Sequence, residues 1–211
     1  MSLRVAVLVS GEGSNLQAIL DRAHGRDGVE VVAVASSKPD VRALDRARAA
    51  GVETGVFAAA AREQRPERDA ALADWLEERD VGLVVLAGWM QILGAPFIRR
   101  FAGRLINVHP SLLPAFPGLR PIEEAVSYGV KVMGVTVHFV DEDVDSGAII
   151  MQESFEVLPY PRDIAAIEER IHEIEHRLLP RAVRLFAAGA VRVDEESPRH
   201  VIVEGVQGGD D

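Results

Sequence analysis

The chain of 211 residues contains no cysteine, and this absence removes several kinds of chemistry at once. Disulfide scaffolds, thiolate metal sites and cysteine nucleophiles all need a thiol, so none of them is available, and a reducing compartment fits. Long apolar runs are also missing. No segment reaches bilayer-spanning length, and the apolar stretch that begins at Arg4 is too short for a signal peptide. We therefore expect a cytoplasmic protein with no membrane partner.

Positive charge is scarce as well. The chain has 23 Lys and Arg against 33 Asp and Glu, which gives a formal net charge of −10. Non-specific nucleic-acid binding depends on basic side chains that neutralise phosphates, so the charge argues against a nucleic-acid partner. An anionic small molecule would need a local binding site, because the overall field does not attract it.

The first half of the chain alternates strand-like and helix-like segments. Helix-type apolar spacing separates the strands, and Pro66 suits the first position of one helix. Alternation of this kind predicts a parallel sheet with right-handed crossovers. The predicted strands cover residues 4–9, 29–35, 52–57, 81–87 and 105–109, and the predicted helices cover 15–23, 40–50 and a segment from Pro66 onward.

The second half departs from strict alternation. Residues 131–140 and 149–157 are strand-like runs joined by a short acidic loop, which predicts an antiparallel pair appended to the parallel sheet. A long amphipathic helix follows. Either Pro161 or Asp163 opens this helix, and Gly189 ends it.

The C-terminal stretch is short and turn-rich. Residues 191–193 and 201–203 predict a small edge hairpin, and we expect the tail over 208–211 to be disordered. The whole pattern predicts an α/β fold, a doubly wound, mostly parallel sheet with an appended antiparallel strand pair. We expect one domain over residues 1–190 and a short, partly disordered extension over 191–211.

Residues 107–114, Asn-Val-His-Pro-Ser-Leu-Leu-Pro, are the most informative stretch. Because side chains alternate along a strand, Asn107 and His109 project to the same side. Pro110 stops the strand, so an amide and an imidazole lie together at its carboxyl end, where open α/β sheets place their ligand crevice. The alternative is a capped strand whose polar residues bond only the nearby backbone.

A glycine-containing turn, residues 10–15 (Ser-Gly-Glu-Gly-Ser-Asn), lies between the first strand and the first helix. Its backbone and the helix N-terminus suit an anion such as a phosphate, although Ser14 or Asn15 as a simple N-cap is the alternative. A dinucleotide fingerprint would need a third glycine where Leu16 stands. A mononucleotide-like ligand therefore fits better than NAD.

The acidic loop over residues 141–147 joins the two late strands. A solvated hairpin explains most of its carboxylates, and its spacing lacks the central glycine and closing glutamate of an EF-hand. A carboxylate from this loop beside His109 would stabilise the imidazolium. His138 shares a strand face with Thr136 and is a further candidate to line a cleft there.

Four segments together resemble the phosphoribosylglycinamide formyltransferases, a folate-dependent family of purine synthesis. The resemblance extends over roughly residues 4–190, nearly the whole chain. The matching segments are residues 10–17 (SGEGSNLQ), 84–93 (VVLAGWMQIL), 107–114 (NVHPSLLP) and 134–147 (GVTVHFVDEDVDSG).

The resemblance implies an enzyme that transfers the formyl group of 10-formyltetrahydrofolate to the amine of 5-phosphoribosylglycinamide. The products would be formylglycinamide ribonucleotide and tetrahydrofolate. It also implies a catalytic trio of Asn107, His109 and Asp145, with no metal. We expect small-molecule substrates only, and either a monomer or a homodimer.

The resemblance further implies two sets of binding residues. His172 and Glu175 lie in the long predicted helix, where the alternative to substrate binding is a solvated helix face. The set for the ribonucleotide substrate is Gly13, Ser14, Asn15, His172 and Glu175. The set for the folate is Arg65, Met90, Gln91, Ile92, Leu93, Asn107, Asp141, Glu142, Asp143, Val144 and Asp145.

Three positions depart from the family pattern. Glu12 places an anion in the glycine-containing turn, and Gln91 stands where many members carry a basic residue. Arg120-Pro121 replaces a run that commonly contains histidine. None of these departures touches the trio, but each bears on how the substrates are held.

Three other functions use some of the same residues. Formyltetrahydrofolate deformylase uses a similar trio with water as the nucleophile, but it usually carries an N-terminal regulatory domain, whereas the first strand here begins at Arg4. Methionyl-tRNA formyltransferase would need a basic C-terminal domain, which the acidic segment after Gly189 does not provide. A nucleotide-binding module without catalysis would need the glycine turn but not Asn107, His109 and Asp145 together.

Overall fold

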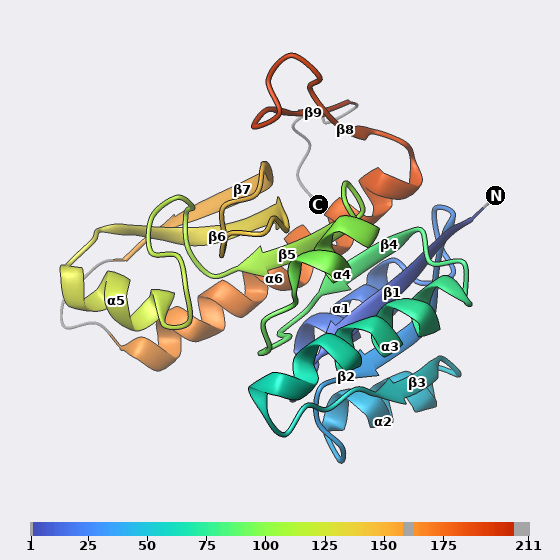
Figure 1. Cartoon of the computed structure of the whole chain (residues 1–211). Coiled ribbons are helices and arrows are strands. Elements are labelled where there is room, and N and C mark those ends of the chain that lie inside the picture. Colours follow the sequence, from blue (N-terminus) through green and yellow to red (C-terminus); the bar gives the residue numbers. More distant parts are fainter. Residues whose placement is uncertain (1, 158–162, 205–211) are drawn as a thin grey trace.

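The computed structural model describes residues 2–157 and 163–204 (Figure 1). Most predicted strands and helices are present, within a few residues of the expected bounds. In chain order the elements are β1 (Leu3–Val9), α1 (Ser14–Arg22), β2 (Val29–Ser36), α2 (Arg42–Ala49), β3 (Glu53–Val56), the short 3-10 helix η1 (Arg62–Gln64), α3 (Arg65–Glu77), β4 (Leu83–Leu86), α4 (Ala95–Arg100), β5 (Leu105–His109), α5 (Pro121–Tyr128), β6 (Val132–Phe139), β7 (Ile149–Glu156), α6 (Ile164–Ala187), β8 (Val191–Val193) and β9 (Val201–Val203).

The main sheet has seven strands in the order β3-β2-β1-β4-β5-β6-β7. Strands β1 to β5 pair in parallel, whereas β6 is antiparallel to β5 and β7 is antiparallel to β6. The predicted fold class, with an antiparallel pair appended to a parallel sheet, is therefore confirmed.

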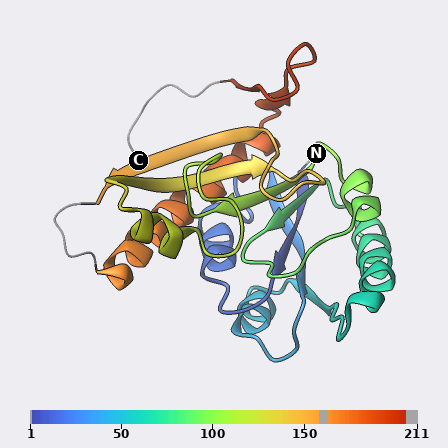
Figure 2. The ribbon, with the colours of Figure 1, turned by 60° about the vertical axis from the view of Figure 1, so that its left-hand side comes forward.

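Both faces of the sheet are covered by helices, as the unbroken apolar run of β1 predicts. Val5, Val7 and Val9 face one core together with α1, α2, α5 and α6. Ala6 and Leu8 face the other core, which α3 and α4 complete. Figure 2 shows α3 and α4 on one side of the sheet and α1 and α6 on the other.

The strand order reverses between β1 and β4, because the chain builds β2 and β3 on one side of β1 and then crosses to the other. At such a point the connections leave in opposite directions and open a crevice at the carboxyl ends of the strands. Ser10 follows β1 there, and its Oγ accepts a hydrogen bond from the backbone N–H of Met90 at 2.8 Å, after β4. The two loops that flank the crevice are thus joined directly.

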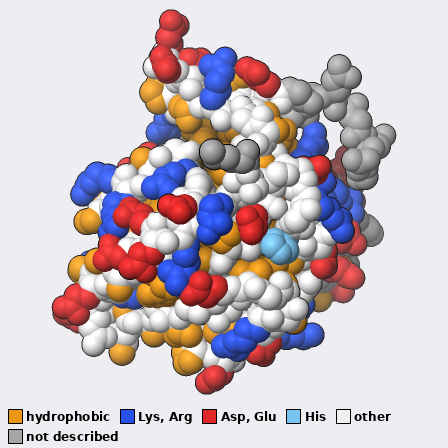
Figure 3. All heavy atoms as spheres, turned by 90° about the vertical axis from the view of Figure 1, so that its right-hand side faces the viewer, with side chains coloured by type: hydrophobic (Ala, Val, Ile, Leu, Met, Phe, Trp, Pro, Cys, Tyr) orange, Lys and Arg blue, Asp and Glu red, His pale blue; other side chains and the backbone are white. Residues whose placement is uncertain are grey.

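The C-terminal hairpin differs from the prediction. Strands β8 and β9 pair with each other as a separate sheet rather than as an edge of the main one. Their four valines pack against the first core, which holds the hairpin on the body of the molecule. Figure 3 shows it at the top of a face on which acidic and basic side chains are interspersed. The predicted disordered tail lies outside the described residues.

Two short helices, α4 and α5, were not predicted, because each has fewer than three turns in which to show an apolar period. Each carries a proline in its first turn. Of the two predicted starts of α6, Asp163 is the N-cap, and its carboxylate accepts from the backbone N–H groups of Ala165 and Ala166. Pro161 lies outside the described residues.

Candidate active site

A cleft of about 400 Å³ opens at the carboxyl ends of β4 and β5, beside the loop that joins β6 to β7. Every residue predicted for the folate lines this cleft. His109 and His138 line it too. The predicted residues are Arg65, Met90, Gln91, Ile92, Leu93, Asn107, Asp141, Glu142, Asp143, Val144 and Asp145.

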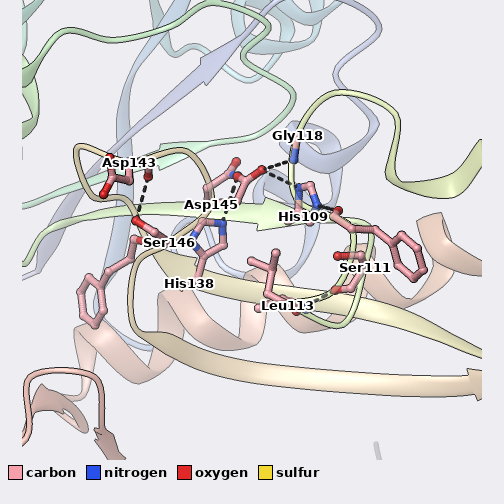
Figure 4. A network of polar contacts seen from close by, with 12 residues as sticks. His109, Ser111, Leu113, Gly118, His138, Asp143, Asp145 and Ser146 are labelled. Carbon is pink, nitrogen blue, oxygen red and sulfur yellow. Dashed lines mark hydrogen bonds and ion pairs between the residues drawn. The ribbon is translucent and has the colours of Figure 1, made fainter. Parts of the chain in front are cut away.

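The structure brings the predicted trio together. His109 Nδ1 lies 3.5 Å from Asp145 Oδ2, and both side chains are largely buried. Asn107 lies two residues before His109 on β5, and its Nδ2 is 3.2 Å from His138 Nε2. Figure 4 shows the Asp145 carboxylate between the rings of His109 and His138.

His109 is oriented by a backbone group. Its Nε2 lies 2.9 Å from the carbonyl oxygen of Phe116, and since a carbonyl only accepts, Nε2 is the donor. Nδ1 is therefore the nitrogen that faces Asp145 and the cleft. Phe116 has φ 51°, which is strained for a bulky residue and aims this carbonyl. The sequence carries no signal for the contact, because the backbone makes it.

Asp145 is held in an unusual backbone conformation. Its φ is 52°, in the left-handed region that aspartate tolerates better than most residues. The N–H of Gly118 donates to its Oδ2 at 2.8 Å. A Cβ on Gly147 would lie 1.8 Å from the Phe139 carbonyl oxygen, so the loop can return to β7 only with glycine there. The loop is thus built to hold one carboxylate against His109.

The segment after His109 is fixed by a buried hydroxyl. Thr136 Oγ1 donates to the carbonyl of Ser111 at 2.7 Å and accepts from the N–H of Leu113 at 3.1 Å. Gln152 on β7 adds a bond from Nε2 to Thr136 Oγ1 at 2.9 Å. The antiparallel pair therefore supports the turn on which the orientation of His109 depends.

The residues predicted for the ribonucleotide form a second group outside the lining of the cleft. Asn15 Nδ2 donates to Glu175 Oε2 at 2.9 Å, which links α1 to α6. Glu175 is buried, so the alternative of a solvated helix face is wrong for it, whereas His172 is exposed. Burial raises the pKa of Glu175, while the Asn15 donor and His172 act in the opposite direction.

Gly13 has two structural reasons to be glycine. Its φ is 74°, and a Cβ there would lie 2.6 Å from Ala43 Cβ on α2. Gly13 is the N-cap residue of α1, which begins at Ser14, and no side chain caps the helix. Ser14 and Asn15 therefore begin the helix, and the alternative that either one is a simple N-cap is wrong.

Glu12, the anion in this loop, is paired. Its Oε1 lies 2.8 Å from Arg42 Nη1 and 2.9 Å from Arg46 Nη2, and both arginines belong to α2. Arg46 also donates through Nε to the Glu12 carbonyl and through Nη1 to Gln17 Oε1, each at 3.0 Å. Two guanidinium groups thus offset one carboxylate, and the cluster adds no net negative charge to the loop.

The other two departures also have defined places. Gln91 lines the cleft. Arg120 is exposed and lies 3.4 Å from Glu123, whereas Pro121 begins α5 and reaches the cleft lining. The helix start thus explains the proline at a position for which the sequence offered no reason.

A buried ion pair supports the loop after β4. Arg68 Nε lies 2.6 Å from Asp69 Oδ1, and both side chains are almost fully buried. Asp69 Oδ2 accepts from the N–H of Gly94 at 2.8 Å, and Arg68 Nη2 donates to the carbonyl of Ile92 at 3.0 Å. The pair anchors the backbone that presents Met90 and Ile92, both exposed, to the cleft.

We expect Asp69→Ala to lower the free energy of unfolding by about 3–5 kcal/mol, because it leaves the buried Arg68 charge uncompensated. Urea denaturation measures the change. Glu67→Ala, at an exposed position of the same helix, is the matched control and should change stability by less than about 0.5 kcal/mol. Equal losses for the two variants would show that the pair does not stabilise the fold.

Two kinds of feature are absent from the described residues. Among them, no helix combines the length and the apolar character that crossing a bilayer requires. Within the same residues, no three His, Asp or Glu side chains gather as a metal-binding group. The absence of a metal remains a prediction.

Comparisons with known proteins identify the family of this chain. Residues 3–183 match the family described as Formyl transferase. The chain is 39% identical over 193 residues to the phosphoribosylglycinamide formyltransferase of Haemophilus influenzae, with 91% of each protein covered. The solved structure of glycinamide ribonucleotide transformylase 1 from Symbiobacterium toebii has a TM-score of 0.89 and 44% identity, covering 96% of this chain and 94% of that one.

Some relatives are much longer. The chain is 44% identical over 195 residues to the trifunctional purine biosynthetic protein adenosine-3 of Bos taurus, and it spans only 19% of that protein. The match to the bacterial enzyme, by contrast, extends over nearly the whole of both chains. This chain therefore belongs to the formyl transferase family and, within it, to the phosphoribosylglycinamide formyltransferases.

Proposed function

We propose that the protein transfers the formyl group of 10-formyltetrahydrofolate to the amine of 5-phosphoribosylglycinamide, a step of purine biosynthesis. The observation that carries the proposal is the meeting of Asn107, His109 and Asp145 in one cleft. A binding module would have no need for an amide donor, an imidazole and a carboxylate gathered in this way. We assign the activity to residues 1–190.

The reaction needs stabilisation of negative charge on the formyl oxygen while the amine attacks the formyl carbon. Asn107 supplies an uncharged donor for that oxygen, and a protonated His109 supplies a charged one through Nδ1. The Phe116 carbonyl already occupies the other ring nitrogen of His109. The tetrahedral intermediate then collapses with cleavage of the bond between the formyl carbon and the folate nitrogen.

A proton must also move from the attacking nitrogen to the leaving one. Asp145 stabilises the His109 imidazolium. It also accepts the amine proton, directly or through one water, before this proton passes to the leaving folate nitrogen. No covalent enzyme intermediate is needed. Holding the two substrates in register supplies much of the remaining acceleration.

The folate occupies the cleft in this proposal. Met90, Ile92 and Val144 expose apolar surface at its walls, which suits flat aromatic rings. Arg65 at its edge suits the carboxylates of the glutamate tail.

The ribonucleotide approaches from the other side of the crevice. Its phosphate binds the backbone of Gly13, Ser14 and Asn15 at the start of α1. His172 and Glu175 contact its glycinamide side. The hydrogen bond from Met90 N–H to Ser10 Oγ ties this loop to the folate loop, so the two substrates are held by one connected frame.

We expect tetrahydrofolate release to depend on 5-phosphoribosylglycinamide. The purified protein is mixed with 10-formyltetrahydrofolate, and release is followed by absorbance with and without the amine. Rates should rise at least about tenfold when the amine is present, because the phosphate loop serves no purpose in hydrolysis. Equal rates would mean that water is the nucleophile, and the deformylase alternative would then be correct.

A further inference from the structure

His138 is placed where it acts on Asn107. The two residues lie directly opposite each other in the antiparallel register of β5 and β6. The pairing of β6 with β7 is irregular between Val137 and His138, and such bulges redirect side chains. The His138 side chain is buried and points toward Asp145 (Figure 4).

The hydrogen-bond partners of His138 define its tautomer. Nδ1 lies 2.7 Å from the carbonyl oxygen of Phe139, so Nδ1 carries a hydrogen. Burial lowers the pKa of His138, and His109 acts in the same direction, whereas the Phe139 carbonyl and Asp145 oppose it. Near neutral pH the ring is therefore uncharged, and Nε2 presents a lone pair.

This lone pair selects one orientation of the Asn107 carboxamide. Nε2 lies 3.2 Å from Asn107 Nδ2, and a lone pair accepts from the amide NH₂. The flipped carboxamide would place Oδ1 against the same lone pair, with two acceptors face to face. A carboxamide by itself has no strong preference between the two orientations, so the ring makes the choice.

We infer that His138 is a positioning residue, whose neutral ring holds the Asn107 amide so that its second hydrogen is free to bind the formyl oxygen. The inference rests on the proposed function. It assigns His138 no contact with the substrate. The ring acts only through Asn107.

The competing role for His138 is that of a direct proton acceptor for the amine. Two titratable groups face its ring among the described residues. Asp145 Oδ1 lies 3.8 Å from Nε2, too far for a hydrogen bond, and His109 belongs to the neighbouring strand. A direct acceptor would act independently of Asn107, whereas a positioning residue would not.

The test compares His138→Leu and His138→Gln in the wild type and in Asn107→Ala. Leucine removes the acceptor, whereas the glutamine Oε1 reaches about the position of Nε2 and accepts in its place. We expect His138→Leu to lower kcat about 10²-fold, as misplacement of a reacting group does, with both KM values nearly unchanged. His138→Gln should recover most of kcat. In Asn107→Ala, His138→Leu should cost less than about threefold.

Two results would overturn the inference. One is a glutamine variant as impaired as the leucine variant, and the other is an undiminished leucine effect in Asn107→Ala. Either would show that the ring acts on the substrate itself. His200→Gln, at an exposed histidine on the C-terminal hairpin, is the control and should match the wild type.

A measurement that does not use activity completes the test. Long-range ¹H–¹⁵N NMR of the imidazole should show His138 neutral and protonated at Nδ1 at pH 7, and an Nε2-protonated ring would contradict the inference. This spectrum and His138→Gln decide the matter if His138→Leu fails to fold. A wild type without amine-dependent transfer would instead overturn the proposed function.

Discussion

Asp145→Asn should lower kcat by about 10²–10⁴-fold while the protein stays folded. The change removes the charge that stabilises the His109 imidazolium and the group that accepts the amine proton. Asparagine keeps the backbone, because it tolerates the φ of 52° at this position, and its amide oxygen still accepts from Gly118 N–H. Steady-state kinetics with both substrates, and a melting curve, measure the two parts of the result.

Asp80→Asn is the matched control, since Asp80 is exposed, also has a positive φ (49°) and lies outside the cleft lining. The substitution removes the same charge from the same backbone conformation, away from the substrates. We expect kcat to change less than about threefold. If the two variants lost activity equally, the effect would come from the loss of one negative charge anywhere on the protein, and Asp145 would have no special role.

His109→Asn should lower kcat by about 10²–10³-fold, the usual effect of losing one donor to a developing oxyanion. The double variant with Asp145→Asn should be little worse than the poorer single variant. The reason is that the imidazolium and the carboxylate act as one unit, with Asp145 Oδ2 3.5 Å from His109 Nδ1. The kcat values of the wild type, the two single variants and the double variant form a double-mutant cycle.

The cycle has a clear contrary outcome. Strictly multiplicative losses would mean that His109 and Asp145 contribute independently. The amine proton would then leave by a path that does not involve their contact. KM for the ribonucleotide should stay nearly constant throughout, because the loop at the start of α1 that we propose for its phosphate lies outside the cleft lining.

Much of the fold follows from local patterns. The apolar run of β1 is covered on both faces, as its lack of alternation requires, and Asp163 caps α6 as its residue type predicts. The placement of Asn107 and His109 on one side of a strand that ends at Pro110 is also local. Side-chain alternation and the missing N–H of proline decide it without help from the rest of the chain.

The partners of these residues are a matter of tertiary structure. Asp145 meets His109 only because the antiparallel β6 returns its loop to the cleft, 36 positions further along the chain. The contacts of His109 with Phe116 and of Asp145 with Gly118 use backbone groups, which every residue has and no composition reveals.

Sequence and packing also decide different things about the charged residues on the side proposed for the ribonucleotide. The sequence alone identified Glu12 as an anion in the turn and left a solvated helix face as the alternative for Glu175. The packing of α2 against the turn pairs Glu12 with Arg42 and Arg46, and the packing of α1 on α6 buries Glu175 against Asn15. Periodicity predicts which face of a helix is buried, but which charged groups meet depends on how the helices pack. The residue types and strand ends were therefore set by the sequence, whereas the pairings that make them a site were decided by packing.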